Sequence, residues 1–147
     1  MILGIGIDVV DMGRIEAVLA RQGRRFVRRI LTPDEAATYE RMARGRQVQY
    51  LAGRFAVKEA VAKALGTGIG GRIGWHDIIT AQADGRPTAV LSPGAMRRWA
   101  ELPALALAGG FMPDGSAVWD KLVIHVSLSH ERRLLVAQAV VEWRLLR

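Results

Sequence analysis

Aliphatic residues alternate with small or polar ones at the start of the chain, and this alternation predicts a β-strand over residues 2–10. From Leu3 to Val9 every second side chain is aliphatic, while Gly4, Gly6 and Asp8 occupy the positions between them. Successive side chains of a strand point to opposite faces, so one face is aliphatic and the other is open to a ligand or a second backbone. Alternatively, the glycines only ease strand packing and Asp8 lies at a strand end beside a turn.

Two helices are predicted next, because apolar residues recur there at helical spacing. The first covers Met12–Gln22 and is ended by Gly23. Thr32 is typical of an N-cap, and Glu35 completes a capping box for a helix that starts at the following proline. We expect this second helix to run to about residue 44, where Gly45 separates it from the next one.

The longest predicted helix is Tyr50–Leu65, which contains no proline and is followed by four glycines between Gly66 and Gly71. We predict a glycine stop and a glycine loop there. Glu59 and Lys63 are four residues apart and therefore share one face of this helix. Apolar residues lie on both sides of the helix, so we expect it to be covered over much of its circumference.

The second half of the chain is predicted to be mainly strands. Near the C-terminus, aliphatic residues alternate with His125, Ser127 and Ser129. We expect the aliphatic side chains of this strand to face inward. The predicted elements are strands over 75–83 and 87–91 around an Asp84-Gly85 hairpin turn, a helix from Ser92 to about 102, a loop or small hairpin over 103–120, and strands over 121–129 and 134–141.

Composition limits the kinds of site that the chain can build. It has 147 residues, which predicts one domain over 1–147, and it has no cysteine, so a metal site would use oxygen or imidazole ligands. The net charge of +7 favours an anionic partner such as a nucleic acid, an acidic protein or a polyphosphate. The N-terminus lacks the pattern of a signal peptide, and the apolar run over 102–112 is too short for a membrane span. We therefore expect a cytoplasmic protein with no membrane partner.

Familiar catalytic and nucleotide-binding motifs fail on context. Gly66, Gly68 and Gly71 match GxGxxG, but a helix precedes them where a dinucleotide site requires a strand. Ser129 and His130 are neighbours on a strand, so their side chains point to opposite faces and do not form a hydrolase pair. The glycine loop and nearby arginines still suit a phosphate group.

Asp8, Glu59 and Lys63 suggest phosphoryl transfer. Two carboxylates from distant segments fit a magnesium ion that is held by few protein ligands and by phosphate oxygens. A lysine one turn further along the helix would add positive charge near the phosphates. The alternative is a plain ion pair between Glu59 and Lys63, which contributes only about 0.2–0.5 kcal/mol.

Three separated motifs carry a resemblance along most of the chain. They are Gly-Ile-Gly-Ile-Asp-Val-Val-Asp at 4–11 with Arg14, Arg-Phe-Ala-Val-Lys-Glu-Ala at 54–60 with Lys-Ala-Leu-Gly-Thr-Gly at 63–68, and His-Val-Ser-Leu-Ser-His-Glu at 125–131. In this order they resemble the holo-acyl carrier protein synthase type of phosphopantetheinyl transferase. The resemblance implies an α+β fold with a small, mostly antiparallel sheet packed on a long central helix, assembled as a homotrimer with active sites at the subunit interfaces.

The resemblance also implies the reaction. Phosphopantetheine would pass from coenzyme A to a serine hydroxyl of an apo acyl carrier protein, releasing adenosine 3',5'-bisphosphate, with magnesium as cofactor. As our own hypothesis on the mechanism, either Glu59 or a metal-bound water takes the serine proton, and Lys63 stabilises or protonates the leaving phosphate. By carry-over, the implied roles are Asp8 and Glu59 for magnesium; Lys63 for the phosphates; Arg54, Gly66, Arg86, Pro87 and His125 for coenzyme A; and Arg14, Arg21 and Arg24 for the acidic carrier protein.

Two departures from the family pattern and one rival function remain. Residue 11 is Asp where the family often has Glu, and the segment 103–120 is longer than the pattern leads us to expect. The rival is a basic nucleic-acid-binding module, supported by the net charge and the arginines over 21–29. Aromatic residues make up only 6% of the chain and no binding motif is present, so we expect no nucleic-acid partner.

Overall fold

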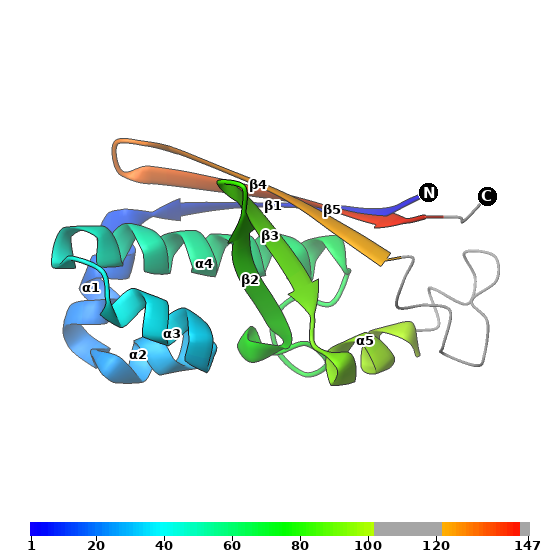
Figure 1. Cartoon of the computed structure of the whole chain (residues 1–147), viewed down its shortest axis with the longest axis horizontal. Coiled ribbons are helices and arrows are strands. Elements are labelled where there is room, and N and C mark those ends of the chain that lie inside the picture. Colours follow the sequence, from blue (N-terminus) through cyan, green and yellow to red (C-terminus); the bar gives the residue numbers. More distant parts are fainter. Residues whose placement is uncertain (102–121, 145–147) are drawn as a thin grey trace.

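Two antiparallel sheets and a long helix form the framework of the molecule, as a computed structural model that describes residues 1–101 and 122–144 shows (Figure 1). The larger sheet has the strand order β1-β5-β4, and the smaller one pairs β2 with β3. The strands are β1 (Ile2–Asp11), β2 (Ile78–Ala83), β3 (Arg86–Leu91), β4 (Leu122–Glu131) and β5 (Leu134–Trp143).

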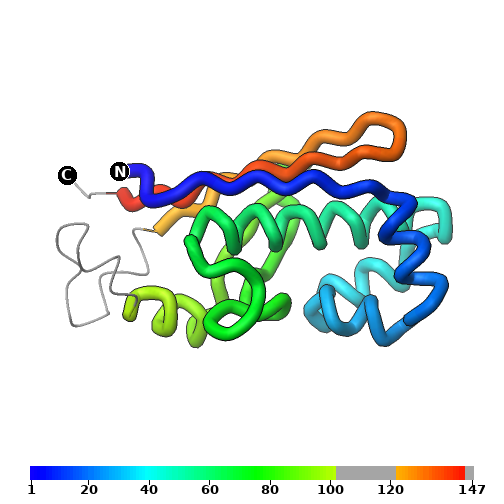
Figure 2. Tube along the Cα trace, turned by 180° about the vertical axis from the view of Figure 1, so that it is seen from behind, coloured from blue at the N-terminus to red at the C-terminus, as the bar shows by residue number. Residues whose placement is uncertain are grey.

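Helix α4 (Arg44–Ala64) lies between the larger sheet and a second layer. In that layer three short helices lie along one half of α4, and the β2–β3 hairpin and the last helix lie along the other half (Figures 1 and 2). The remaining helices are α1 (Met12–Gln22), α2 (Arg24–Ile30), α3 (Pro33–Glu40), the 3-10 turn η1 (Trp75–Asp77) and α5 (Pro93–Ala100).

Strand β1 approaches α4 closely because it carries glycines on the face toward the helix. A Cβ atom at Gly6 would overlap the carbonyl oxygen of Ala60, and one at Gly4 would overlap that of Ala64. The glycine face of the first strand thus meets a second backbone, which was one of the two predicted uses of that face. Asp8 lies on the same strand and is thereby brought to the surface of α4.

The opposite face of the larger sheet is uncovered in the single chain. Ile5, Ile7 and Val9 are 57–65% exposed, and the alternate residues of β5 that face α4, such as Ala137 and Ala139, are fully buried. The strand register places the exposed β1 residues in rows with outward residues of β5 and β4, namely Ile5–Val140–His125, Ile7–Gln138–Ser127 and Val9–Val136–Ser129. The predicted separation of His125, Ser127 and Ser129 from the inward aliphatic side chains of β4 is confirmed.

The predicted α+β class, with antiparallel strands packed on a long helix, is confirmed. The capping box of Thr32 and Glu35, the stop at Gly23 and the hairpin turn at Asp84-Gly85 are all present. Among the described helices none has the length and apolar character of a membrane span. That all 147 residues form one domain stays a prediction, since the segment 103–120 lies outside the described residues.

Several predicted boundaries were wrong. The long helix α4, predicted to start at Tyr50, starts at Arg44. Helix α3 ends at Glu40, and Gly45 does not separate two helices but lies in the first turn of α4, where no other atom crowds it. Residues Trp75–Asp77 form a 3-10 turn before the strand begins. Helix α2 was not predicted, because its apolar residues Phe26, Val27 and Ile30 stand among arginines that we interpreted only as a charged surface.

Candidate active site

Lys63 joins the central helix to the first strand. Its Nζ donates to Oδ1 of Asp8 at 2.8 Å and to the carbonyl oxygen of Ile7 at 3.0 Å. The alternative that Lys63 only pairs with Glu59 along the helix is thus not what the structure shows, since Lys63 is hydrogen-bonded to Asp8 on β1. Its side chain is half exposed, which leaves it open to a ligand.

Glu59 lies one turn before Lys63 and is half-buried. Burial raises the pKa of Glu59, and the negative charge of Asp8 raises it further, while the ammonium of Lys63 partly opposes both effects. A cation between two carboxylates that repel one another would stabilise their ionised forms.

A pocket of about 400 Å³ opens beside these carboxylates. Its wall combines acidic groups with one guanidinium and with aromatic rings from α2 and α4. Its lining includes Asp8, Glu59, Arg14, Phe26 and Phe55.

The oxygen ligands of this pocket fit magnesium. Asp8 and Glu59 supply carboxylate oxygens, and magnesium is commonly held by one or two carboxylates together with water and substrate phosphates. A cage of three or more acidic or histidine side chains is absent from the described residues, 1–101 and 122–144. The acidic pair can therefore contribute to a magnesium site that the phosphates of a substrate complete.

The glycine loop ends α4 as predicted, with Gly66 in the left-handed region at φ +75°. The amide of Gly66 donates to the carbonyl oxygen of Lys63 at 3.0 Å, and those of Thr67 and Gly68 donate to Ala62 at 3.1 Å. These amides satisfy the last carbonyls of the helix. They are not directed at a phosphate, so the predicted contact of Gly66 with coenzyme A would have to use other atoms.

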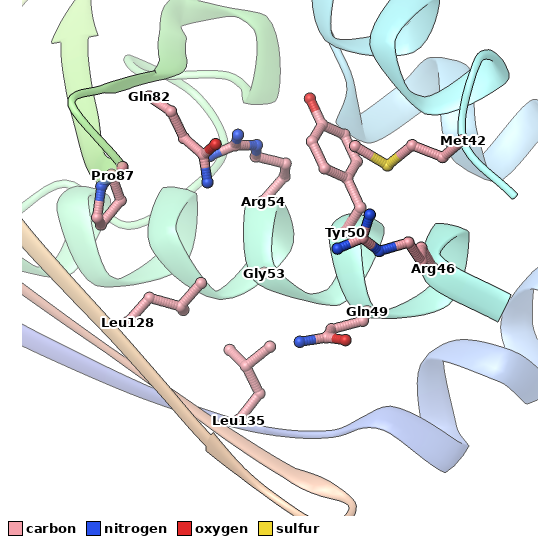
Figure 3. Close-up of a pocket in the computed structure, with 11 residues that line it drawn as sticks. Met42, Arg46, Gln49, Tyr50, Gly53, Arg54, Gln82, Pro87, Leu128 and Leu135 are labelled. Atoms are coloured by element: carbon pink, nitrogen blue, oxygen red, sulfur yellow. The ribbon is translucent and has the colours of Figure 1, made fainter.

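Arg54 lies on a different side of α4, above a pocket of about 420 Å³ (Figure 3). The residue is only 7% exposed, and its guanidinium stacks over the ring of Tyr50 at 4.7 Å. Its Nε is buried without a hydrogen-bond partner among the described residues. Figure 3 shows the guanidinium directed toward Gln82, with Pro87 on the same side of the pocket.

The other predicted coenzyme A residues lie at the edge between the hairpin and β4. Arg86, Pro87 and His125 line one opening of about 640 Å³. Nε2 of His125 lies 2.7 Å from Oε2 of Glu142, and this hydrogen bond holds the pKa of Glu142 below its ordinary value.

The predicted site residues therefore fall into two groups within one chain. Asp8 and Glu59 line one pocket together with Arg14, and Lys63 is bonded to Asp8. Arg54, Arg86, Pro87 and His125 line two adjoining openings that share Pro87, and neither has a residue in common with the acidic pocket. Arg21 and Arg24 are exposed on α1 and α2.

One buried polar cluster was missed by the sequence analysis. Lys58 is fully buried and its Nζ lies 2.7 Å from Oε2 of Glu35. Burial raises the pKa of Glu35, but the hydrogen bond and charge of Lys58, with hydrogen bonds from Thr80 and Thr32, bring it below its ordinary value. A sequence signal existed, because Lys58 lies in a helix that was expected to be covered and therefore needed a buried partner.

Comparison with known proteins places the chain in a family. The model of the 4'-phosphopantetheinyl transferase superfamily matches residues 4–109. A holo-[acyl-carrier-protein] synthase of Shouchella clausii is 40% identical over 143 residues, which cover 97% of this chain and 99% of that protein. The synthase of Geobacillus kaustophilus is 43% identical over 97% of this chain and 90% of its own length.

Solved structures agree with these relatives. The crystal structure of holo-[acyl-carrier-protein] synthase from Neisseria meningitidis has a TM-score of 0.76 and 35% identity, over 97% of this chain and 99% of that one. The synthase from Bacillus anthracis, described as a complex with CoA (3',5'-ADP), has a TM-score of 0.73 and 33% identity, over 98% and 99%. The chain thus belongs to the 4'-phosphopantetheinyl transferase superfamily, as an enzyme of the holo-acyl carrier protein synthase type.

Proposed function

We propose that this chain transfers phosphopantetheine from coenzyme A to a serine hydroxyl of an apo acyl carrier protein, with magnesium held by Asp8 and Glu59. The observation that carries the proposal is the convergence of Asp8, Glu59 and Lys63 from β1 and α4 beside one pocket. The names of the relatives and the coenzyme A complex of the Bacillus anthracis enzyme support the two substrates.

The magnesium ion would supply positive charge against the pyrophosphate of coenzyme A. Asp8 and Glu59 would hold it from one side of the pocket. Lys63 keeps Asp8 in place through the 2.8 Å bond, and its half-exposed ammonium can also face a phosphate oxygen. Arg14 lines the pocket and would add a second positive charge.

The transfer forms a bond between the serine oxygen and the β-phosphorus of coenzyme A. The bond from that phosphorus to the bridging oxygen breaks, and adenosine 3',5'-bisphosphate leaves. Lys63 would stabilise or protonate the leaving phosphate, and the serine proton would pass to Glu59 or to a water. A carboxylate that already faces a cation is a weaker base, which favours the water.

Arg54, Arg86, Pro87 and His125 would hold the nucleotide end of coenzyme A. The support for this role is that Arg54 lines a pocket that shares Pro87 with the opening lined by Arg86 and His125, and a cation there attracts the phosphates of a nucleotide. Gly66 belongs to the same proposal only through atoms other than its amide, which caps α4.

A homotrimer would join the two groups of site residues and cover the open sheet face. Ile5, Ile7 and Val9 form an apolar row that a single chain leaves in water, and a neighbouring copy would bury it. The acidic group of one chain would then meet the nucleotide group of another. Analytical ultracentrifugation checks this arrangement, since a stable monomer with full activity would contradict it.

The carrier protein would dock on the arginines of α1 and α2. Arg14 lies at the acidic pocket, and Arg21 and Arg24 are exposed near the turn between the two helices. An acidic protein is attracted to such a surface, and salt weakens this attraction. A cytoplasmic location and the lack of a nucleic-acid partner stay predictions.

The test of the proposed function is intact-mass spectrometry of apo acyl carrier proteins after incubation with this protein and coenzyme A. We expect a mass gain of one phosphopantetheine with magnesium and none with a chelator present. If several folded carrier proteins gained no mass, the proposed substrates would be wrong. Transfer that survives the chelator would contradict the metal site alone.

A further inference from the structure

The ammonium of Lys58 connects four elements of the fold by hydrogen bonds. From α4 its Nζ donates to the carbonyl oxygen of Ile30 at the end of α2 at 2.8 Å, to Oε2 of Glu35 on α3 at 2.7 Å, and to the carbonyl oxygen of Trp75 in η1 at 2.9 Å. An ammonium has three N–H donors, and each has a partner here. Lys58 therefore cannot bind a ligand, and its effect must pass through the groups that it holds.

Two of these contacts lead to the walls of the acidic pocket. Phe26 lies one turn before Ile30 on the same face of α2 and lines that pocket. Phe55, the second aromatic wall, stacks on the ring of Trp75 with centroids 4.9 Å apart. Both aromatic rings are thus anchored to Lys58, one through α2 and the other through η1.

We propose that Lys58 is a positioning residue for the transfer reaction, which sets the space beside Asp8 and Glu59 by holding Phe26 and Phe55 in place. Reacting groups must be held to within a fraction of an ångström, and a misplacement of about 1 Å can cost about 100-fold in rate. The inference rests on the proposed function, because it assigns the pocket to the reacting groups.

Lys58→Met is the variant that removes the anchor, and two controls separate positioning from stability. Glu35→Gln removes the charge of the ion pair but leaves the bonds of Lys58 to Ile30 and Trp75. Val141→Ala removes a fully buried side chain of β5 that lines none of the described pockets. All variants are compared at temperatures where circular dichroism shows them folded.

If Lys58→Met does not fold, Lys58→Arg tests the same positioning role. It keeps a cation beside Glu35, but its longer planar guanidinium cannot offer three donors from one point to the same three acceptors. The ion pair is then retained while α2 and η1 are displaced.

Fluorine NMR can observe the two pocket walls directly, because the chain contains only three phenylalanines, Phe26, Phe55 and Phe111. After incorporation of 4-fluorophenylalanine, and with Phe111→Leu in every protein, two resonances remain. We expect both resonances to shift or broaden with the Lys58 substitutions and to stay in place with the two controls. This measurement does not depend on turnover, so its failure is distinct from a failure of the proposed function.

The kinetic arm uses the mass assay with coenzyme A and the carrier protein varied separately. We expect the Lys58 substitutions to lower kcat about 10- to 100-fold, while KM for coenzyme A stays within about threefold. The controls should keep kcat close to that of the wild type. Unchanged fluorine resonances, or a folded Lys58 variant with kcat within about twofold of the wild type, would overturn the proposal.

Discussion

Helix α4 carries two lysine–carboxylate pairs of nearly equal length in different surroundings. Lys58 and Glu35 are 2.7 Å apart with side chains 0% and 3% exposed. Lys63 and Asp8 are 2.8 Å apart with side chains 49% and 14% exposed. The two lysines are five residues apart, so they point to different sides of the helix, one to the short helices and the other to β1.

The comparison shows that burial decides what such a pair can do. All three donors of Lys58 end on protein acceptors, whereas Lys63 makes two such bonds among the described residues and remains half exposed. The first pair therefore holds elements together, and the second, with Glu59 beside it, can face a substrate. The predictions below test this division of roles.

The largest expected effect is on turnover. Glu59→Gln should lower kcat at least about 100-fold, because it removes one of the two carboxylates proposed to hold magnesium. The unfolding free energy should change by less than about 1 kcal/mol, since Glu59 makes none of the buried contacts of the Lys58 pair. Intact-mass kinetics and urea unfolding measure the two quantities, and retention of most activity would remove Glu59 from both of its proposed roles.

A second test displaces β1, the strand that carries Asp8 of the half-exposed pair with Lys63. Gly6→Ala should lower the unfolding free energy by about 1–3 kcal/mol, because its Cβ overlaps the carbonyl oxygen of Ala60. It should also lower activity by moving Asp8 away from Glu59. Gly45→Ala is the matched control in an uncrowded helical position and should stabilise the protein by about 0.5–1 kcal/mol. Equal stabilities of the two variants would contradict the close approach.

A smaller effect on the unfolding free energy is expected when the pH is lowered. The pKa of Glu35 in the folded protein lies below its unfolded value, so its contribution to stability is present above about pH 4.3 and is lost as the pH falls through the folded pKa. Urea unfolding of the wild type from pH 7 to pH 3 should therefore show a decline that Glu35→Gln reduces. Parallel curves for the two proteins would show that Glu35 does not contribute in this way.

The smallest effect on stability should come from breaking the half-exposed pair of Lys63 and Asp8. Lys63→Met should lower the unfolding free energy by less than about 1 kcal/mol, because partly exposed ion pairs contribute little. Its turnover should nevertheless fall, since Lys63 is proposed to act on the leaving phosphate. A loss of several kcal/mol would mean that the open pair is as structural as the buried one.

Local features of the fold could be predicted because they depend on neighbouring residues. The capping box of Thr32 and Glu35 and the turn at Asp84-Gly85 each follow from a few adjacent side chains. Helix α2 escaped prediction because its short apolar pattern is interrupted by charges. The pair of Lys58 and Glu35 escaped because 23 residues separate its members, and no periodicity reports on such a contact.

The roles of the candidate site residues stay predictions, and their arrangement in space could not be predicted from the sequence. The motifs around Asp8 and Glu59 single out both carboxylates, and the structure brings them to one pocket. Which partner Lys63 takes could not be predicted, since Glu59 along the helix and Asp8 across to β1 are both within the reach of a lysine. The sequence also does not show that Arg54 and His125 line openings separate from the acidic pocket.

By itself, the sequence determined that the first strand has an aliphatic and a glycine face and that a long helix ends in glycines. It also predicted phosphoryl transfer from Asp8, Glu59 and Lys63, which stays a prediction. Only the tertiary structure decided that the glycine face is the covered one and that Ile5, Ile7 and Val9 are left in water. The physical reason is that alternation distinguishes two faces of a strand without saying which is buried. Here the close backbone approach of Gly4 and Gly6 to α4 decides between them.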